Sequence, residues 1–238
     1  MLRLILGGLL VAAFSACAPL LPRPLPDVLI LGEQHDAPAH QRLHRDVVQS
    51  LAERGELAGV AVEMAQAGHS TAGLPRDATE AQVRAALAWT EPGWPWAAYA
   101  PAIMAAVHAG ATVAGGDLTR EQLKQAGADA SIDTLVSRKV LQAQMEDVRE
   151  GHCGLLPESQ LLPLARAQIA RDRSLARAVA QLALPGKTAV LITGSHHADT
   201  ALGVPLHLPA SLRSVSKSWP PQPPAEDYCE QLRKRFSK

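Results

Sequence analysis

The stretch that decides the fold is LILGEQHDAPAH, residues 29–40. An apolar, strand-like run ends at Gly32, and Glu33 and His35 follow directly, two positions apart. In extended backbone, residues two positions apart point to the same side. The stretch therefore predicts a buried strand whose end directs a carboxylate and an imidazole toward one place.

The overall composition is that of an ordinary globular protein. The chain has 238 residues, long enough for one α/β domain with its own core, and 47% of them are hydrophobic. Its 23 Lys and Arg residues balance 23 Asp and Glu residues. Since no net positive field attracts a polyanion, nucleic acid is not an expected partner.

The first residues predict export. Residues 1–16 carry one Arg, an apolar segment and then small residues, which is typical of a signal peptide. The sequence Ser15-Ala16-Cys17 resembles a bacterial lipobox, although Phe14 stands where Leu is usual. The resemblance implies cleavage before Cys17 and attachment of lipid, such as palmitate, to that cysteine.

The expected location follows from the same segment. Ala18 rather than Asp follows the cysteine, which by resemblance to enterobacterial sorting rules favours the outer membrane, on its periplasmic side or at the surface. The alternative is an ordinary signal peptide cut near Ala16.

Strand and helix signals alternate along the rest of the chain. Short apolar runs bounded by Gly or polar residues predict strands over 27–32, 59–64, 111–116 and 188–193. Helical patterns cover 37–54, 79–89, 97–109, 131–150 and 158–184. This alternation predicts an α/β fold, a parallel-type central sheet flanked by helices. We expect a helical insertion between 118 and 185, before the last core strand, to lie over one edge of the sheet.

The predicted domain limits follow changes in composition. Residues 17–26 are Pro-rich and predict an extended tether, and residues 27–216 form the α/β domain. Residues 217–238 are Pro-rich and then charged, which predicts a surface tail.

Each predicted strand ends in polar residues. They are Glu33 with His35, Glu63, Asp117, and the pair His196 and His197. Because ligands of open parallel sheets bind beyond the carboxyl ends of the strands, we expect a shared site of Glu33, His35, Glu63 and His197. We expect Asp117 only to begin a loop, and one of the two adjacent histidines, His196, to be structural.

The helix predicted over 158–184 carries polar residues on its apolar face. Gln168 and Asp172 lie in that stripe, and Arg171 lies at its edge. Buried polar groups need partners, so these side chains either anchor loop backbone or reach the site. Both interpretations stay open.

The motifs LGEQHD, VAVEM, HCGLLPES, AQIARDRSLA and ITGSHHADTALGVPLHL, in this order and spacing, resemble the ChaN-like haem-binding lipoproteins. The family belongs to a superfamily with the Tiki and TraB proteases and the erythromycin esterases. The resemblance implies haem binding, iron uptake and a possible homodimer. Two departures stand out: Asp117 replaces a usual Asn, and Ser174-Leu175 replaces a usual Met-Ala pair.

Aromatic residues near position 95 are candidates for holding haem. Trp94 and Trp96 offer flat apolar walls, and Tyr99 is a candidate ligand of ferric iron, with His152 and His108 as alternatives. The competing interpretation is that the Trp rings pack the insertion onto the sheet.

Two other functions compete with haem binding. A hydrolase, protease-like or esterase-like, would use Glu33, His35, Glu63 and His197 as catalytic residues, or as ligands of a divalent metal such as Zn or Mn. A structural lipoprotein with a degenerate site is the third possibility. In an oxidising compartment, Cys153 and Cys229 either pair or stay free, and their spacing does not decide between the two.

Overall fold

The computed structural model describes residues 24–91, 93–224 and 226–236. The predicted signal peptide 1–16, Cys17 and most of the predicted tether lie outside these ranges. None of the helices within them is both long enough and apolar enough to cross a membrane.

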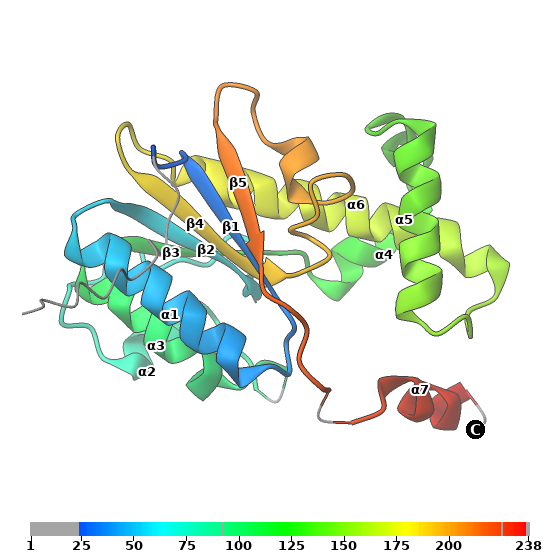
Figure 1. Cartoon of the computed structure of the whole chain (residues 1–238), viewed down its shortest axis with the longest axis horizontal. Coiled ribbons are helices and arrows are strands. Elements are labelled where there is room, and N and C mark those ends of the chain that lie inside the picture. The colour runs from blue at the N-terminus through cyan, green and yellow to red at the C-terminus, as the bar shows by residue number, and fades with distance from the viewer. Residues whose placement is uncertain (1–23, 92, 225, 237–238) are drawn as a thin grey trace, which may run out of the picture.

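A five-stranded parallel sheet forms the centre of the molecule (Figure 1). Its strands are β1 (Val28–Glu33), β2 (Leu57–Gln66), β3 (Thr112–Asp117), β4 (Thr188–Gly194) and β5 (Ser214–Ser218). The strand order is β3-β2-β4-β1-β5, with β1 pairing residue for residue with β4 from Val28 to Glu33. β1, β2 and β4 are almost completely buried, as expected for strands covered on both faces.

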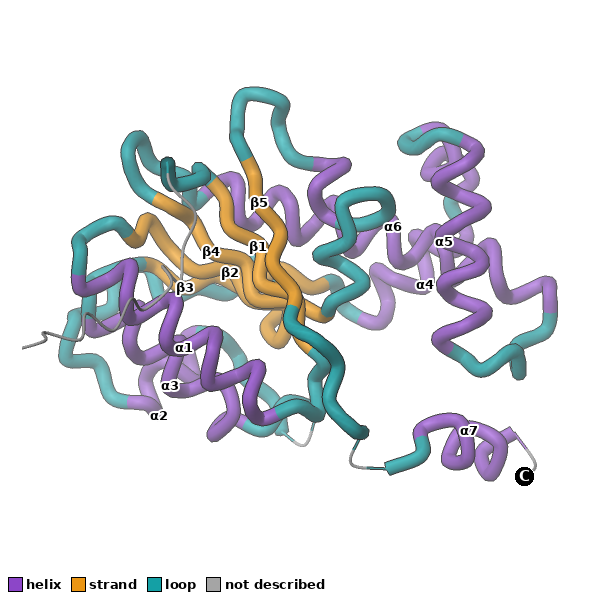
Figure 2. Tube along the Cα trace, viewed as in Figure 1, coloured by secondary structure: helices purple, strands orange, loops and turns teal. Residues whose placement is uncertain are grey.

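Helices cover both faces of the sheet (Figure 2). They are α1 (Pro38–Glu53), α2 (Glu80–Ala86), α3 (Trp96–His108), α4 (Arg120–Ala128), α5 (Arg138–Gly151), α6 (Glu158–Gln181) and α7 (Tyr228–Phe236), with short 3₁₀ helices η1 (Ala130–Thr134) and η2 (Val204–His207). The chain crosses from β1 to β2 through α1 and from β2 to β3 through α2 and α3, and it returns from β3 to β4 through α6.

Alternate residues of β1, β2 and β4 belong to two separate cores. Leu29 and Leu31 pack with α1 and α3, whereas Val28 and Ile30 pack with α6. This alternation is the two-residue period of an extended strand. It also assigns the strand ends to faces: Glu33 has the parity of Leu31 and points toward α1 and α3.

The predicted fold class is confirmed, and the predicted elements need three corrections. The helix predicted over 131–150 is two elements, because Ser137 caps a new helix by accepting a hydrogen bond from the Val140 amide. The insertion is more than an edge feature, since α6 packs against β2, β3 and β4. Helix α4 was not predicted, although Thr119 and Gln122 form a capping box at its start.

The C-terminal segment, predicted to be a surface tail from residue 217, contains two further elements that were not predicted. Strand β5 crosses that limit and pairs with β1, and α7 follows it. The β5 sequence is polar and largely exposed, as suits an edge strand, so it carries no apolar run to detect. A disulfide joins Cys153 and Cys229 across 76 residues, with Cα atoms 5.8 Å apart.

Two leucines allow a matched test of this core. Leu191 on β4 is fully buried, whereas Leu184 is 51% exposed. We expect Leu191→Ala to lower the free energy of unfolding by about 2–5 kcal/mol, and Leu184→Ala to change it by less than about 0.5 kcal/mol. Urea denaturation measures both, and equal losses would contradict the assigned core.

Candidate functional site

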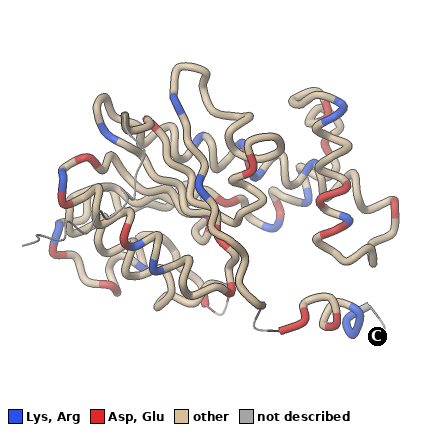
Figure 3. Tube along the Cα trace, in the orientation of Figure 1, with Lys and Arg blue, Asp and Glu red and all other residues tan. Residues whose placement is uncertain are grey.

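Charged residues of strands β1 to β4 gather at the carboxyl edge of the sheet. Within β1 to β4 they are Glu33, Glu63 and Asp117, each at or near the carboxyl end of its strand. Figure 3 shows the contrast between the nearly uncharged sheet and the mixed charges of the surrounding helices and loops. Glu33 is 1% exposed and Glu63 is 5% exposed. Both carboxylates are therefore cut off from water and need partners within the protein.

Glu33 is held from the α1 and α3 side. Its Oε1 atom lies 2.8 Å from His35 Nδ1 and accepts a 2.5 Å hydrogen bond from the Tyr99 hydroxyl. Its Oε2 atom accepts a 3.3 Å hydrogen bond from Gln41 Nε2 and lies 3.2 Å from His44 Nδ1. His35 lies in the turn after β1 rather than in extended backbone, and its ring contacts the Glu33 carboxylate directly.

Glu63 is held from the α6 side. Its Oε2 atom accepts hydrogen bonds from the Thr193 hydroxyl at 2.7 Å and from the Gly194 amide at 2.8 Å. Its Oε1 atom lies 3.6 Å from His197 Nε2, and His197 Nδ1 lies 2.6 Å from Asp172 Oδ1. Asp172, on the apolar stripe of α6, thus reaches the site rather than loop backbone.

The side chains around Glu33 and those around Glu63 meet at Gly194. A Cβ atom at this position would lie 2.9 Å from His35 Nε2 and 3.6 Å from Glu63 Oε2. The imidazole of His35 therefore lies over the glycine, in space that any other residue would fill. The structure brings together Glu33, His35, Glu63 and His197 at the carboxyl edge of the sheet.

Burial and charge set the protonation of the inner groups. Burial alone would lower the pKa of His197, but Glu63 and Asp172 outweigh it and raise this pKa to about 9. Burial opposes ionisation of Glu63, yet His197, His35 and the Gly194 amide lower its pKa to about 2. His197 is therefore an imidazolium at neutral pH, which does not suit a general base.

His35 and Tyr99 differ in their access to a ligand. The His35 side chain is 40% exposed. Burial lowers the pKa of His35, but the hydrogen bond to Glu33 and the charge of Glu63 outweigh burial, so this pKa lies above its ordinary value. Tyr99 is 3% exposed, and burial together with Glu33 raises the pKa of its hydroxyl. For Tyr99 to bind iron as a phenolate, its bond to Glu33 would have to break.

The predicted tryptophans have different surroundings. Trp94 is half-buried and lies edge-to-face on His35, with ring centroids 4.7 Å apart. Trp96 is 5% exposed, packs on Trp89, and donates its Nε1 hydrogen to Glu80 Oε2 at 2.7 Å. Trp94 therefore borders the site, whereas Trp96 packs the helical layer.

The remaining candidates lie around or away from this edge. Asp117 pairs with Arg171 at 2.7 Å, and Arg171 also donates to Gln168. His196 pairs with Asp147 of α5 at 2.7 Å, which links the loop after β4 to the insertion.

Two histidines were alternative iron ligands. His152 follows α5, and its Nδ1 lies 2.8 Å from the Val148 carbonyl oxygen. His108 ends α3 just before β3, at the opposite edge of the sheet, so it does not belong to the site.

The predicted Zn or Mn site lacks support. Across residues 24–91, 93–224 and 226–236, no three His, Cys, Asp or Glu side chains are arranged to hold a metal ion. The physical reason is that Glu33, His35, Glu63 and His197 satisfy one another and neighbouring donors.

Sequence reasoning missed Gln41 and His44, which hold Glu33 from α1. Both are buried on the inward face of that helix, beside Val47, Val48 and Leu51. Polar residues on an apolar stripe were the signal that singled out Asp172, and the same signal was present here.

Ligand-binding proteins and enzymes with a parallel α/β sheet have their sites at the carboxyl ends of the strands. The carboxylate–imidazole site of this chain lies in the same place. Residues 26–208 match the family model described as haem-binding uptake, Tiki superfamily, ChaN. The chain belongs to this family.

A solved structure supports the same fold. The structure of cofacial haem binding to ChaN of Campylobacter jejuni is 21% identical, with a TM-score of 0.65 over 81% of each chain. Among curated proteins, none matches the chain.

The inner pair gives a pH-dependent prediction. The pKa of His197 is about 9 in the folded protein against 6.5 ordinarily, so its stabilising contribution is complete below pH 6.5 and is lost as pH rises through 9. The contribution is on the order of 3 kcal/mol. We expect the wild-type protein to lose stability over this interval and His197→Gln to lose much less. Urea denaturation at about pH 6 and about pH 9.5 tests this; parallel losses in both proteins would contradict it.

Proposed function

We propose that this protein binds haem at the carboxyl edge of its sheet, with His35 as the iron ligand, and serves haem or iron uptake. One observation carries the proposal. The His35 ring is 40% exposed, its Nδ1 lies 2.8 Å from Glu33, and it lies against Trp94. A carboxylate on one ring nitrogen fixes the tautomer and leaves the other nitrogen for a metal.

The residues present fit the group. Haem supplies an iron that takes an imidazole or phenolate ligand and a porphyrin that needs flat apolar contacts. His35 Nε2 lies over Gly194, and Trp94 provides the apolar ring beside it. Glu33 orients His35, and Tyr99 and Gln41 in turn fix Glu33. His152, on the insertion beyond the sheet, is the alternative ligand.

The proposal extends to assembly and location. The related Campylobacter jejuni structure is described as binding haem cofacially. In our proposal, two copies of this chain face each other and enclose haem between their carboxyl edges. We further propose that residues 1–16 are removed and that lipid on Cys17 anchors the protein to the outer membrane.

Two matched variants test the ligand. His35→Ala removes the proposed iron ligand and is expected to weaken haem binding about 100-fold, or roughly 3 kcal/mol. Tyr99→Phe removes only a support of Glu33, so the Soret band keeps its position and the affinity falls less. Titration of haem into each variant measures both quantities. An unchanged spectrum in His35→Ala, or a lost one in Tyr99→Phe, would reject His35 in favour of another ligand.

The anchor has a separate test. Replacing Cys17 by Ser removes the only lipid acceptor of the predicted lipobox, so we expect the variant to leave the membrane fraction. Cell fractionation and the mass of the intact protein measure this outcome. A Cys17→Ser protein that stays in membranes with unchanged mass would show that the segment is no lipobox.

A further inference from the structure

The segment after β5 runs along the border of the site. We call residues 219–224 the strap. The Trp219 ring packs on two histidines of α1, with centroids 5.9 Å from His40 and 5.2 Å from His44. The Pro220 carbonyl oxygen lies 3.2 Å from His40 Nε2. The strap is therefore fixed to the first turns of the helix that holds Glu33.

The strap also holds the side chain of the residue between Glu33 and His35. The Gln222 amide donates to Gln34 Oε1 at 2.9 Å, and Gln34 Nε2 donates back to the Gln222 carbonyl oxygen at 3.0 Å. Gln34 is the residue between the carboxylate and the imidazole. A movement of the strap thus changes the restraint on the pair that would hold haem.

A second contact connects the strap to Glu33. His44 is 1% exposed, and burial lowers its pKa to about 4 although Glu33 lies beside it. Neither ring nitrogen of His44 makes a hydrogen bond in the described part of the chain, and Trp219 packs against the ring. Trp219 therefore keeps water from a neutral histidine that lies 3.2 Å from Glu33.

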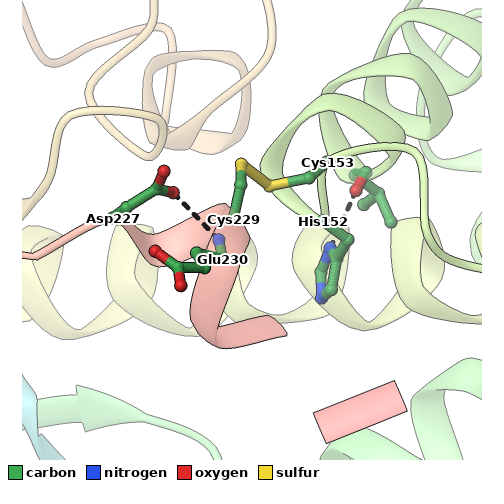
Figure 4. Close-up of a disulfide and its surroundings, with 6 residues drawn as sticks. His152, Cys153, Asp227, Cys229 and Glu230 are labelled. Atoms are coloured by element: carbon green, nitrogen blue, oxygen red, sulfur yellow. Dashed lines mark hydrogen bonds between the residues drawn. A yellow bond between two sulfur atoms is a disulfide. The ribbon is translucent and has the colours of Figure 1, made fainter. Parts of the chain in front are cut away.

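The far end of the C-terminal segment is attached covalently. Helix α7 lies apart from the helices that cover the sheet (Figure 1), and the disulfide from Cys229 to Cys153 ties it to the end of α5. Figure 4 shows that Cys153 directly follows His152. Both cysteines are half-buried, so a small reductant can reach the bond.

We propose that the Cys153–Cys229 disulfide holds the strap against the site, so that its reduction by a dithiol loosens the strap and speeds release of haem. This inference rests on the proposed haem function. The strap continues from β5 at one end, and the bond tethers its other end through α7, which raises the effective concentration of the strap at its contacts. Without the bond, the strap is tethered at the β5 end alone and keeps its contacts to Gln34, His40 and His44 and the packing of Trp219 on the core.

The redox step is balanced by the reductant. A dithiol transfers two electrons and two protons, the Cys153–Cys229 bond breaks to give two thiols, and the dithiol becomes a disulfide. Reoxidation by a disulfide of a more oxidising couple restores the strap. The device thus couples the haem site to the thiol balance of the compartment.

The test uses the full chain, oxidised and after mild dithiol treatment, with Cys153→Ser/Cys229→Ser as the matched variant. Cys17 is common to all samples. Without haem, hydrogen exchange of the Gln222 amide reports the strap, and the Leu191 amide in β4 reports folding. With haem, transfer to excess apomyoglobin gives the rate of release.

We expect reduction to speed both Gln222 exchange and haem release about tenfold, with Leu191 exchange unchanged. The double variant should show the fast rates with or without dithiol. Unchanged Gln222 exchange, or unchanged haem release, would overturn the inference. Lack of saturable haem binding in every form would instead overturn both the proposed function and its regulation. In that case, Gln222 exchange would still show whether the disulfide holds the strap.

Discussion

The Glu33 carboxylate is the group on which the rest of the site depends. It ends a central strand with 1% exposure, and an unpaired charge in such a position costs several kcal/mol, on the order of 3–5 when one partner of a buried pair is removed. The chain meets this cost with three side chains that hydrogen-bond to Glu33, from the strand end, α1 and α3. The charge of Glu33 therefore determines the geometry of these neighbours.

Glu63 is also a buried carboxylate held by partners within the protein, on the opposite face of the sheet. Its carboxylate accepts hydrogen bonds from the Gly194 amide and the Thr193 hydroxyl, and it lies 3.6 Å from the His197 imidazolium, which Asp172 contacts from the other side. The two arrangements meet above Gly194, where the absence of a side chain leaves room for His35. An accessible imidazole on a rigid, fully partnered support is what a metal-containing cofactor requires.

Much of the fold could be predicted because its signals are local. Uninterrupted apolar runs marked β1 to β4, and polar residues at their ends marked Glu33, Glu63 and His197 as neighbours. Strand β5 was missed because an exposed edge strand needs no apolar run, and its sequence SVSKS has little local signal. The helix over 131–150 was wrong in its extent because one capping residue, Ser137, outweighed a continuous amphipathic pattern.

The rest of the site depends on contacts between distant residues. No spacing indicates that Gln222 pairs with Gln34, 188 positions away, or that Cys229 reaches Cys153. Trp94 and Trp96 have the same chemistry in the sequence and differ only in what packs on them, so their separate roles needed the structure. Gln41 and His44 are different, because their place on an apolar helix face was visible beforehand.

We propose that the carboxylate–imidazole pair at the end of β1 presents His35 to haem iron. An experimental structure of the haem-loaded protein would identify the atom bonded to iron. We expect this atom to be His35 Nε2, with Glu33 still on Nδ1 and Trp94 against the porphyrin. Iron bonded to Tyr99, or haem bound away from the carboxyl edge of the sheet, would contradict it.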